Sequence, residues 1–335
     1  MTQDPSNEPL LEVKDLSVFF HMREGDDFFA IRDLSLSIAR GESLGVVGES
    51  GSGKSLTSAA IMGLLPANAE VSGSIRFLGQ ELIGAKESEL RELRGKRLAV
   101  IAQDALTALN PVHTVGKQIA EAISVHDNSL SRSELRSRAV DLLDLVGISQ
   151  PETRVDNYPH EFSGGMRQRA LIAMCVANEP DLIIADEPTT ALDVTVQAQI
   201  LDVLSRIQDR TSSSLMLITH DLGVIAGFAN RVAVMYSGDV IEEGGVDSVF
   251  YETAHPYTRG LLGSLPRLDA RNRSEPLYRI PGFQPSPAQR PAGCSFHPRC
   301  SVAVAGKCET EIPIVHRAGP EHVARCHLVQ NQEAN

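Results

Sequence analysis

The sequence has no tryptophan, only 4% aromatic residues, five cysteines and no long apolar run. A membrane helix needs about 20 predominantly apolar residues, and no segment approaches that length. Residues 1–8 are polar and acidic, unlike an apolar leader. A surplus of positive charge is also missing, because the formal net charge is −12. This charge argues against nucleic-acid binding through bulk electrostatics. A local basic groove would be the remaining way to bind a nucleic acid. We therefore expect a cytosolic chain that reaches a membrane only through partners.

The chain does contain enough apolar material for a large core, with 42% hydrophobic residues among 335. This length predicts one large domain with an appendage, or two domains. Composition changes at His255-Pro256, after which prolines recur. We expect a first domain over residues 1–258 and a Pro-rich second domain over 259–335. The second is expected to be held by something other than burial.

Residues 48–55 read Gly-Glu-Ser-Gly-Ser-Gly-Lys-Ser, the spacing of a phosphate-binding loop. Glycines let successive N–H groups point at one anion. An apolar strand over 43–47 and a helix over 56–65 fit on either side, which argues against a chance Gly/Ser-rich turn. Lys54 is expected to reach the β- and γ-phosphates, and Ser55 to bind Mg²⁺. The loop residues expected to contact the nucleotide are Gly48, Ser50, Gly51, Gly53, Lys54 and Ser55.

The segments before and after this loop predict an α/β protein. An N-terminal antiparallel β-subdomain is expected, and its Phe20 is placed to stack on an adenine ring, although Phe20 as ordinary core is the alternative. A helical insert is expected at about residues 105–178. Its helix over 132–146 is expected to be capped by Ser131 or Ser133 and ended by Gly147. Strands and helices alternate around it, as in a parallel sheet covered on both faces. The expected strands cover 10–20, 28–31, 34–38, 71–77, 98–102, 181–187, 214–219, 232–236 and 240–243, and the expected helices cover 81–94, 114–125, 132–146, 166–177, 196–210 and 221–229.

Two acids, Asp186 and Glu187, stand at the carboxyl end of an apolar strand, where open α/β sheets place ligands. An Asp there can hold Mg²⁺ near Ser55, and the neighbouring Glu can orient or deprotonate an attacking water. Solvated turn acids are the alternative if the pair is taken alone. The loop at 48–55 favours the catalytic interpretation.

Residues 162–166, Phe-Ser-Gly-Gly-Met, predict a helix N-terminus that is capped by Ser163. Two glycines allow a ligand to approach closely, and the helix dipole favours an anion. One phosphate site is already present, so this second one needs another explanation.

These motifs resemble those of the ATP-binding-cassette (ABC) ATPases, whose signature is close to Leu-Ser-Gly-Gly-Gln, and the resemblance covers about residues 10–250. In that family two subunits face each other, and the signature of one covers the γ-phosphate held by the other. The resemblance implies that Ser163, Gly164 and Gly165 act on the partner's ATP. It also identifies Gln103 as the Q-loop glutamine, residues 191–193 as the D-loop with Asp193 at the nucleotide, Glu187 as catalytic, and His220 as the switch histidine. Mg²⁺ is implied at Ser55, Gln103 and Asp186.

Within that family the chain is similar to the ATPase subunits of dipeptide and oligopeptide permeases. The match is carried by residues 103–111, 158–169, 255–258 and 293–300, with Ala102 and Ala105 as departures beside Gln103. The resemblance implies ATP-driven peptide uptake at the cytoplasmic face of the cell membrane. The implied partners are a second ATPase subunit, two membrane permease subunits and, indirectly, an extracytoplasmic peptide-binding protein. No nucleic acid is expected.

Four cysteines fall in the Pro-rich tail: Cys294, Cys300, Cys308 and Cys326. Four thiolates suit a tetrahedral Zn²⁺ site or an iron–sulfur cluster, and their spacing does not choose between the two. Resemblance to the peptide permease group implies a [4Fe–4S] cluster. His297, His322 and His327 are possible substitute ligands, with surface or second-shell positions as the alternative. Cys175 lies in an apolar helix and is expected to be inert core.

Rival functions come from other classes. A cassette ATPase acting on nucleic acid usually has two cassettes or long coiled-coil inserts, and this chain shows neither. A metal- or redox-sensing regulatory subunit would not need an intact Glu187. An exporter often fuses its cassette to membrane helices, and this sequence shows no such helices.

Overall fold

The computed structural model describes residues 8–190, 192–265 and 278–329, which form two compact units. The first unit comprises the described residues of 1–11, 38–43 and 77–218. The second comprises 12–37, 44–76 and the described residues from 219 onward. Ala191 of the expected D-loop lies outside the described residues. The domain boundary expected at residue 258 stays a prediction.

Three parallel strands form the centre of the first unit, in the order β8 (Ser214–Thr219), β7 (Leu182–Asp186) and β6 (Leu98–Ile101). Their register pairs Asp186 with Ile218 and Ile101 with Ala185. Leu182 to Ala185 are completely buried, which explains why these strands read as continuous apolar runs. The helix α8 (Val194–Thr211) packs against α7 (Gly164–Cys175), and α7 packs against β6.

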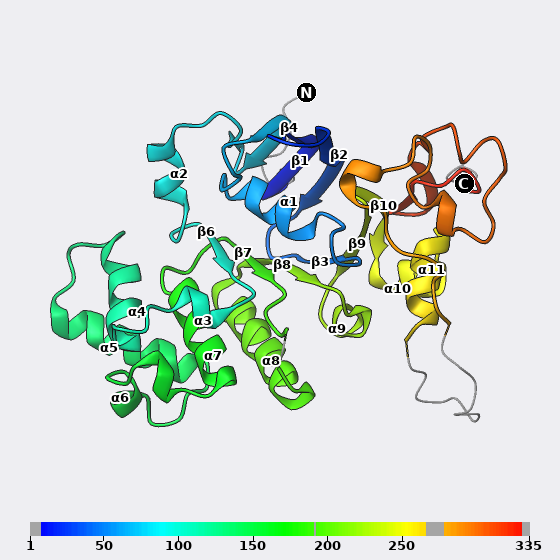
Figure 1. Ribbon diagram of the computed structural model, residues 1–335. Coiled ribbons are helices and arrows are strands. Elements are labelled where there is room, and N and C mark those ends of the chain that lie inside the picture. Colours follow the sequence, from blue (N-terminus) through cyan, green and yellow to red (C-terminus); the bar gives the residue numbers. More distant parts are fainter. Residues whose placement is uncertain (1–7, 191, 266–277, 330–335) are drawn as a thin grey trace, which may run out of the picture. The chain divides into compact units, whose positions relative to one another are not determined.

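The expected helical insert is confirmed as a cluster of helices in this unit (Figure 1). The Ser131 hydroxyl accepts a hydrogen bond from the Glu134 N–H, and the Glu134 carboxylate accepts one from the Ser131 N–H, so a capping box starts the central helix. Gly147 follows that helix with φ 73°, as expected of a terminating glycine. The cluster consists of α3 (Ala105–Ala108), α4 (Val115–Ser124), α5 (Arg132–Leu145), α6 (Pro151–Arg154), the 3₁₀ turn η2 (Pro159–Glu161) and α7.

The helix expected over 81–94 is shorter in the structure. Only α2 (Glu87–Leu93) is helical, and β5 (Gln80–Glu81) precedes it. Gly84 stands between them with φ 77°, a left-handed conformation that breaks a helix.

In the second unit, β1 (Leu11–Phe20) lies between β2 (Phe28–Ile38) and β4 (Ala69–Phe77). Two strands were expected where β2 forms a single one. Asp33 marks the expected break with φ 47°, and its N–H donates to the Ser17 hydroxyl, which keeps the strand continuous.

A second sheet of this unit has the order β3 (Ser43–Val47), β9 (Arg231–Tyr236), β10 (Asp239–Gly245), β12 (His322–Ala324) and β11 (His316–Gly319). β3 and β9 are parallel, whereas β9, β10, β12 and β11 are antiparallel neighbours. The sheet is therefore mixed rather than purely parallel. The remaining helices of the unit are α1 (Lys54–Ile61), α9 (Leu222–Ala226), α10 (Val246–Tyr251), α11 (Pro256–Gly263) and the 3₁₀ turns η3 (Pro287–Gln289) and η4 (His297–Arg299).

The Pro-rich tail extends this sheet, which its composition did not predict. Glu242 of β10 pairs in register with Ala324 of β12. Phe296 and Ile280 are buried, so the tail has apolar contacts of its own. Burial therefore contributes to holding the tail, contrary to expectation.

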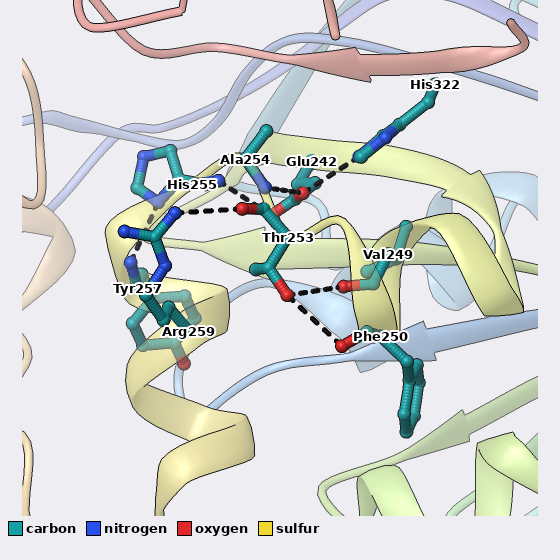
Figure 2. A network of polar contacts seen from close by, with 9 residues as sticks. All are labelled: Glu242, Val249, Phe250, Thr253, Ala254, His255, Tyr257, Arg259 and His322. Atoms are coloured by element: carbon teal, nitrogen blue, oxygen red, sulfur yellow. Dashed lines mark hydrogen bonds and ion pairs between the residues drawn. The ribbon is translucent and has the colours of Figure 1, made fainter. Parts of the chain in front are cut away.

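A buried carboxylate joins the tail to the helix α11 (Figure 2). Glu242 is 1% exposed and accepts hydrogen bonds from the N–H groups of Ala254 and His255, at 2.6 and 3.0 Å. His322 of β12 lies 2.9 Å from Glu242 through Nε2. Glu242, His255 and His322 are each 1% exposed, so loss of one partner would leave a buried charge poorly compensated.

No helix within the described ranges combines the length and apolarity needed to cross a bilayer.

Candidate nucleotide-binding site

The loop at residues 48–55 has the backbone conformation of an anion cradle. Gly51 and Gly53 adopt φ 80° and φ 102°, which only glycine takes without strain. A Cβ on Gly48 would lie 2.2 Å from the Met235 carbonyl oxygen, so this position has no room for a side chain. The helix α1 begins at Lys54 and follows the buried strand β3. Strand, loop and helix therefore occur as the motif predicts.

Lys54 is 4% exposed, and its ammonium donates to the carbonyls of Gly48 and Glu49, at 2.8 and 3.0 Å. The Lys54 ammonium is therefore enclosed by the backbone of the loop. The Ser52 carbonyl accepts from the Gly238 N–H at 2.8 Å, which ties the loop to the β9–β10 turn. Among the described residues, the buried Ser52 hydroxyl has no hydrogen-bond partner. Such a cradle with an unsatisfied polar atom fits a phosphate group. Ser50, Gly51 and Ser55 are exposed.

Glu49 connects the loop to residues far along the chain. Its N–H donates to the Tyr257 hydroxyl at 3.0 Å, and its carboxylate lies 3.0 Å from Nη1 of Arg299. Burial raises the pKa of Tyr257. Neither Tyr257 nor Arg299 was expected at this site, although both lie in segments that carried the permease resemblance.

The acidic end of β7 is built around a strained residue. Glu187 has φ 47°, an uncommon conformation for a side chain other than glycine, and its N–H donates to the Ile218 carbonyl at 2.9 Å. Its Oε2 accepts from Gln103 Nε2 at 3.1 Å and from the Thr190 hydroxyl at 2.8 Å. Strain of this kind concentrates at functional sites. The structure thus brings Gln103 and Glu187 together, and Asp186 ends the strand beside them.

The signature segment forms a capped helix start, as expected. The Ser163 hydroxyl accepts from the Met166 N–H at 3.3 Å, and α7 follows with 12 residues. Ser163 and Gly164 are exposed, whereas Gly165 is buried against Val196 of α8, which a Cβ on Gly165 would approach to 2.7 Å. The exposed N-terminus of α7 can therefore meet an anion from another molecule.

Three other expected residues have local roles. The Asp193 carboxylate caps α8 by accepting from the Val196 N–H at 3.0 Å. His220 is exposed at the end of β8. Phe20 stacks on Phe28 with ring centroids 5.6 Å apart.

The expected site residues divide between the two units. The second unit contains Phe20, the loop at 48–55 and His220, whereas the first contains Gln103, Asp186, Glu187, Asp193 and the signature segment.

The four tail cysteines are free thiols. The Cys294 N–H donates to the Cys308 carbonyl at 2.9 Å. Burial raises the pKa of Cys294 to about 11 and also raises the pKa values of Cys300 and Cys326. In the part of the chain that the structure describes, no group of three or more His, Cys, Asp or Glu side chains is arranged to hold a metal ion. The donor chemistry suits a soft metal, but this arrangement does not form a ligand cage.

Cys175 behaves as the apolar position that the sequence predicts. Its thiol donates to the Val100 carbonyl at 3.2 Å, and burial raises its pKa to about 12. A thiol that stays protonated is a poor nucleophile and metal ligand.

The sequence of this chain is similar to those of known protein families. A family model described as "ABC transporter" matches residues 31–190, and one described as "Oligopeptide/dipeptide transporter, C-terminal region" matches residues 241–308. The oligopeptide transport ATP-binding protein OppD of Mycobacterium tuberculosis is 51% identical over 318 residues, which are 95% of this chain and 52% of the relative. The dipeptide transport ATP-binding protein DppD of Lactococcus lactis is 46% identical over 325 residues, 97% of this chain and 92% of the relative.

Among solved structures, a dimeric ATP-binding cassette bound to ADP and Pi in a post-hydrolysis state is similar. Its TM-score is 0.63 at 26% identity, and the match covers 70% of this chain and 98% of that chain. The present chain spans about half the length of the mycobacterial relative.

Proposed function

The chain belongs to the family of ABC transporter ATP-binding proteins, and we propose that it hydrolyses ATP to energise the uptake of peptides. The single observation that carries this proposal is the pair of Glu187 and Gln103 at the end of β7, in a chain with an intact phosphate-binding loop. Relatives named for dipeptide and oligopeptide transport support the substrate class.

In the proposed mechanism, Lys54 and the loop N–H groups hold the phosphates. Ser55, Gln103 and Asp186 are the residues that would hold Mg²⁺, and a bound Mg²⁺ neutralises charge on the phosphate oxygens. Glu187 orients the attacking water and takes its proton, with Gln103 holding the carboxylate by the hydrogen bond described above. His220 contacts the γ-phosphate, and Phe20 stacks on the adenine. These groups act by positioning and by stabilising charge.

The second anion site is proposed to act on a partner's nucleotide. Ser163, Gly164 and Gly165 present the N-terminus of α7, and Asp193 caps the start of α8, which packs against α7. Ser163 and Gly164 are exposed. A second ATPase subunit, identical or related, would then complete each site, and ATP would close the dimer until hydrolysis reopens it.

Glu187→Gln tests this function. The variant keeps the side-chain shape but removes the base, so we expect hydrolysis to fall by 10²-fold or more, in the range that general bases contribute. ATP should remain bound and hold a closed dimer, measurable by retained nucleotide and by size-exclusion chromatography with light scattering. A matched control is Glu179→Gln, which changes a carboxylate outside the site. Wild-type turnover in Glu187→Gln would contradict the assignment of Glu187 as base.

We further propose that the chain binds at the cytoplasmic face of the cell membrane as a peripheral subunit. Its partners would be two membrane permease subunits and, through them, an extracytoplasmic peptide-binding protein. The exposed segment before α4 supports this, because Val112 is 71% exposed and follows the Gln103 region directly.

For the tail we propose a [4Fe–4S] cluster bound by Cys294, Cys300, Cys308 and Cys326, with Zn²⁺ as the alternative. Support comes from four unpaired thiols within one short segment and from the resemblance to peptide permease subunits. Binding would require the thiols to lose their protons and to move together, since the described arrangement is not a ligand cage.

A further inference from the structure

Arg299 brings a charge from the tail to the phosphate-binding loop. It is the last residue of η4, and its side chain is only 6% exposed. Its Nη1 lies 3.0 Å from Oε2 of Glu49, and its Nε donates to the Pro281 carbonyl at 2.9 Å. A guanidinium that is hydrogen-bonded on two sides has a fixed position. It can therefore hold Glu49 in one place.

Aromatic residues pack against the Arg299 side of this ion pair, where the side chain is only 6% exposed. The Arg299 guanidinium carbon lies 5.7 Å from the centre of the Tyr236 ring and 6.0 Å from that of Phe296. Nη1 also lies 3.4 Å from the Tyr236 hydroxyl. Charge-assisted hydrogen bonds are stronger than neutral ones, and shielding from water makes the loss of one partner more costly.

Glu49 is held at three points in the loop. Its carboxylate contacts Arg299, its N–H donates to Tyr257, and its carbonyl accepts from Lys54. The Lys54 ammonium, which is expected to bind the phosphates, therefore donates to the same residue, Glu49, that Arg299 holds. A shift of Glu49 would therefore change both the curl of the loop and the place of Lys54.

The tail reaches the loop at a second point. A Cβ on Gly51 would lie 3.8 Å from Nε2 of Gln284, which is ordinary contact distance. Gln284 and Arg299 both belong to the tail, and Gly51 and Glu49 stand two residues apart in the loop. The tail thus contacts the loop at two points, Glu49 and Gly51.

We propose that Arg299 is a positioning residue for nucleotide binding, which makes the tail a working part of the phosphate site. The proposal rests on the proposed function of this chain as an ATPase. Arg299 does not touch the nucleotide in this account. It keeps Glu49 in place, so that the loop does not have to be ordered when phosphate binds. Ordering even one residue costs enough free energy to weaken binding about tenfold.

The experiment measures ADP binding to the full chain with Mg²⁺ by isothermal titration calorimetry, in a double-mutant cycle. We expect Arg299→Met and Glu49→Gln each to raise Kd about tenfold, and the double variant to be no weaker than either single one. Arg299→Lys should restore part of the affinity because it retains the charge. In ATP hydrolysis, KM should rise while kcat changes little, because the Glu187 region is untouched. Arg279→Met, at an exposed arginine of the tail, is the matched control and should leave Kd unchanged.

Other outcomes separate this inference from the proposed function. Wild-type protein that binds no ADP would contradict the ATPase proposal itself. Normal wild-type binding with an unchanged Kd in Arg299→Met, or additive effects in the double variant, would overturn the role of Arg299. If Arg299→Met does not fold, Glu49→Gln decides the question, since the Glu49 side chain is 30% exposed and the change keeps its shape.

Discussion

At the scale of single residues, His255 provides a pH-sensitive element of stability. Its imidazole is 1% exposed, and Nδ1 accepts a hydrogen bond from the Tyr257 N–H at 3.0 Å, which caps α11. Burial lowers its pKa from 6.5 to about 4, although the nearby Glu242 raises it. The folded chain thus keeps His255 neutral at pH values where the unfolded chain protonates it.

This difference predicts that stability falls with acidification. The folded pKa lies below the unfolded value, so the contribution of His255 is complete above pH 6.5 and is lost progressively toward pH 4. The loss approaches roughly 3 kcal/mol, because one pKa unit corresponds to about 1.4 kcal/mol. His255→Asn keeps a capping acceptor without the titration, so its urea midpoint should fall less between pH 7 and pH 5. The exposed His160→Asn is the control. Equal pH dependence in wild type and His255→Asn would refute this account.

Sequence reasoning at this scale was strongest where one residue type alone fits. Gly48, Gly53 and Lys54 could be proposed as nucleotide contacts because a phosphate loop needs bare backbone and a cation at fixed spacing. Arg299 and Tyr257 could not, because Glu49 meets them only after some 200 intervening residues have folded. Position in the sequence gives no sign of such contacts.

At the scale of elements, strong local patterns predicted structure well. The strand expected over 43–47 forms with the same ends, since a buried parallel strand is apolar throughout. The capping box at Ser131 fixed the start of α5. β11 and β12 could not be predicted, because they are short and contain His316, Arg317 and His322 rather than an apolar pattern. Pairing with β10 and the buried Glu242–His322 contact hold them instead.

The segment between Gln103 and α4 gives a prediction about coupling to the membrane subunits. Val112→Asp places a charge on an exposed apolar residue that we propose to meet a permease subunit. We expect ATP hydrolysis by the isolated chain to stay normal, while co-purification with the permease subunits is lost, because burying an unpaired carboxylate in an interface is costly. Val125→Asp is the matched control, because Val125 lies just after the other end of α4 and is 67% exposed, against 71% for Val112. Equal complex formation by the Val112 variant and wild type would count against this surface.

At the scale of the whole molecule, the tail is joined to the cassette by strand pairing, by Glu242 and by Arg299. The sequence predicted a separate Pro-rich domain because proline content suggested little burial. Composition cannot report that β12 extends a sheet formed about 80 residues earlier, since pairing depends on contacts distant in the chain.

The metal content of the whole chain tests the role of the cysteines. Protein purified without oxygen should contain about four iron and four sulfide per chain if a [4Fe–4S] cluster is bound. Cys294→Ser should lose both, whereas Cys175→Ser should keep them, since the raised pKa of Cys175 keeps its thiol protonated. About one zinc per chain would indicate that the cysteines form a structural zinc site instead of an iron–sulfur cluster. Protein with neither metal would refute the proposed ligand set.

The central claim is that ATP hydrolysis by this chain drives peptide uptake. The most direct measurement is accumulation of a labelled oligopeptide in vesicles that contain the chain with the proposed permease subunits and peptide-binding protein. We expect accumulation to require ATP and to be abolished by Glu187→Gln, while the variant still assembles. Peptide accumulation that continues at the wild-type rate with Glu187→Gln would contradict it.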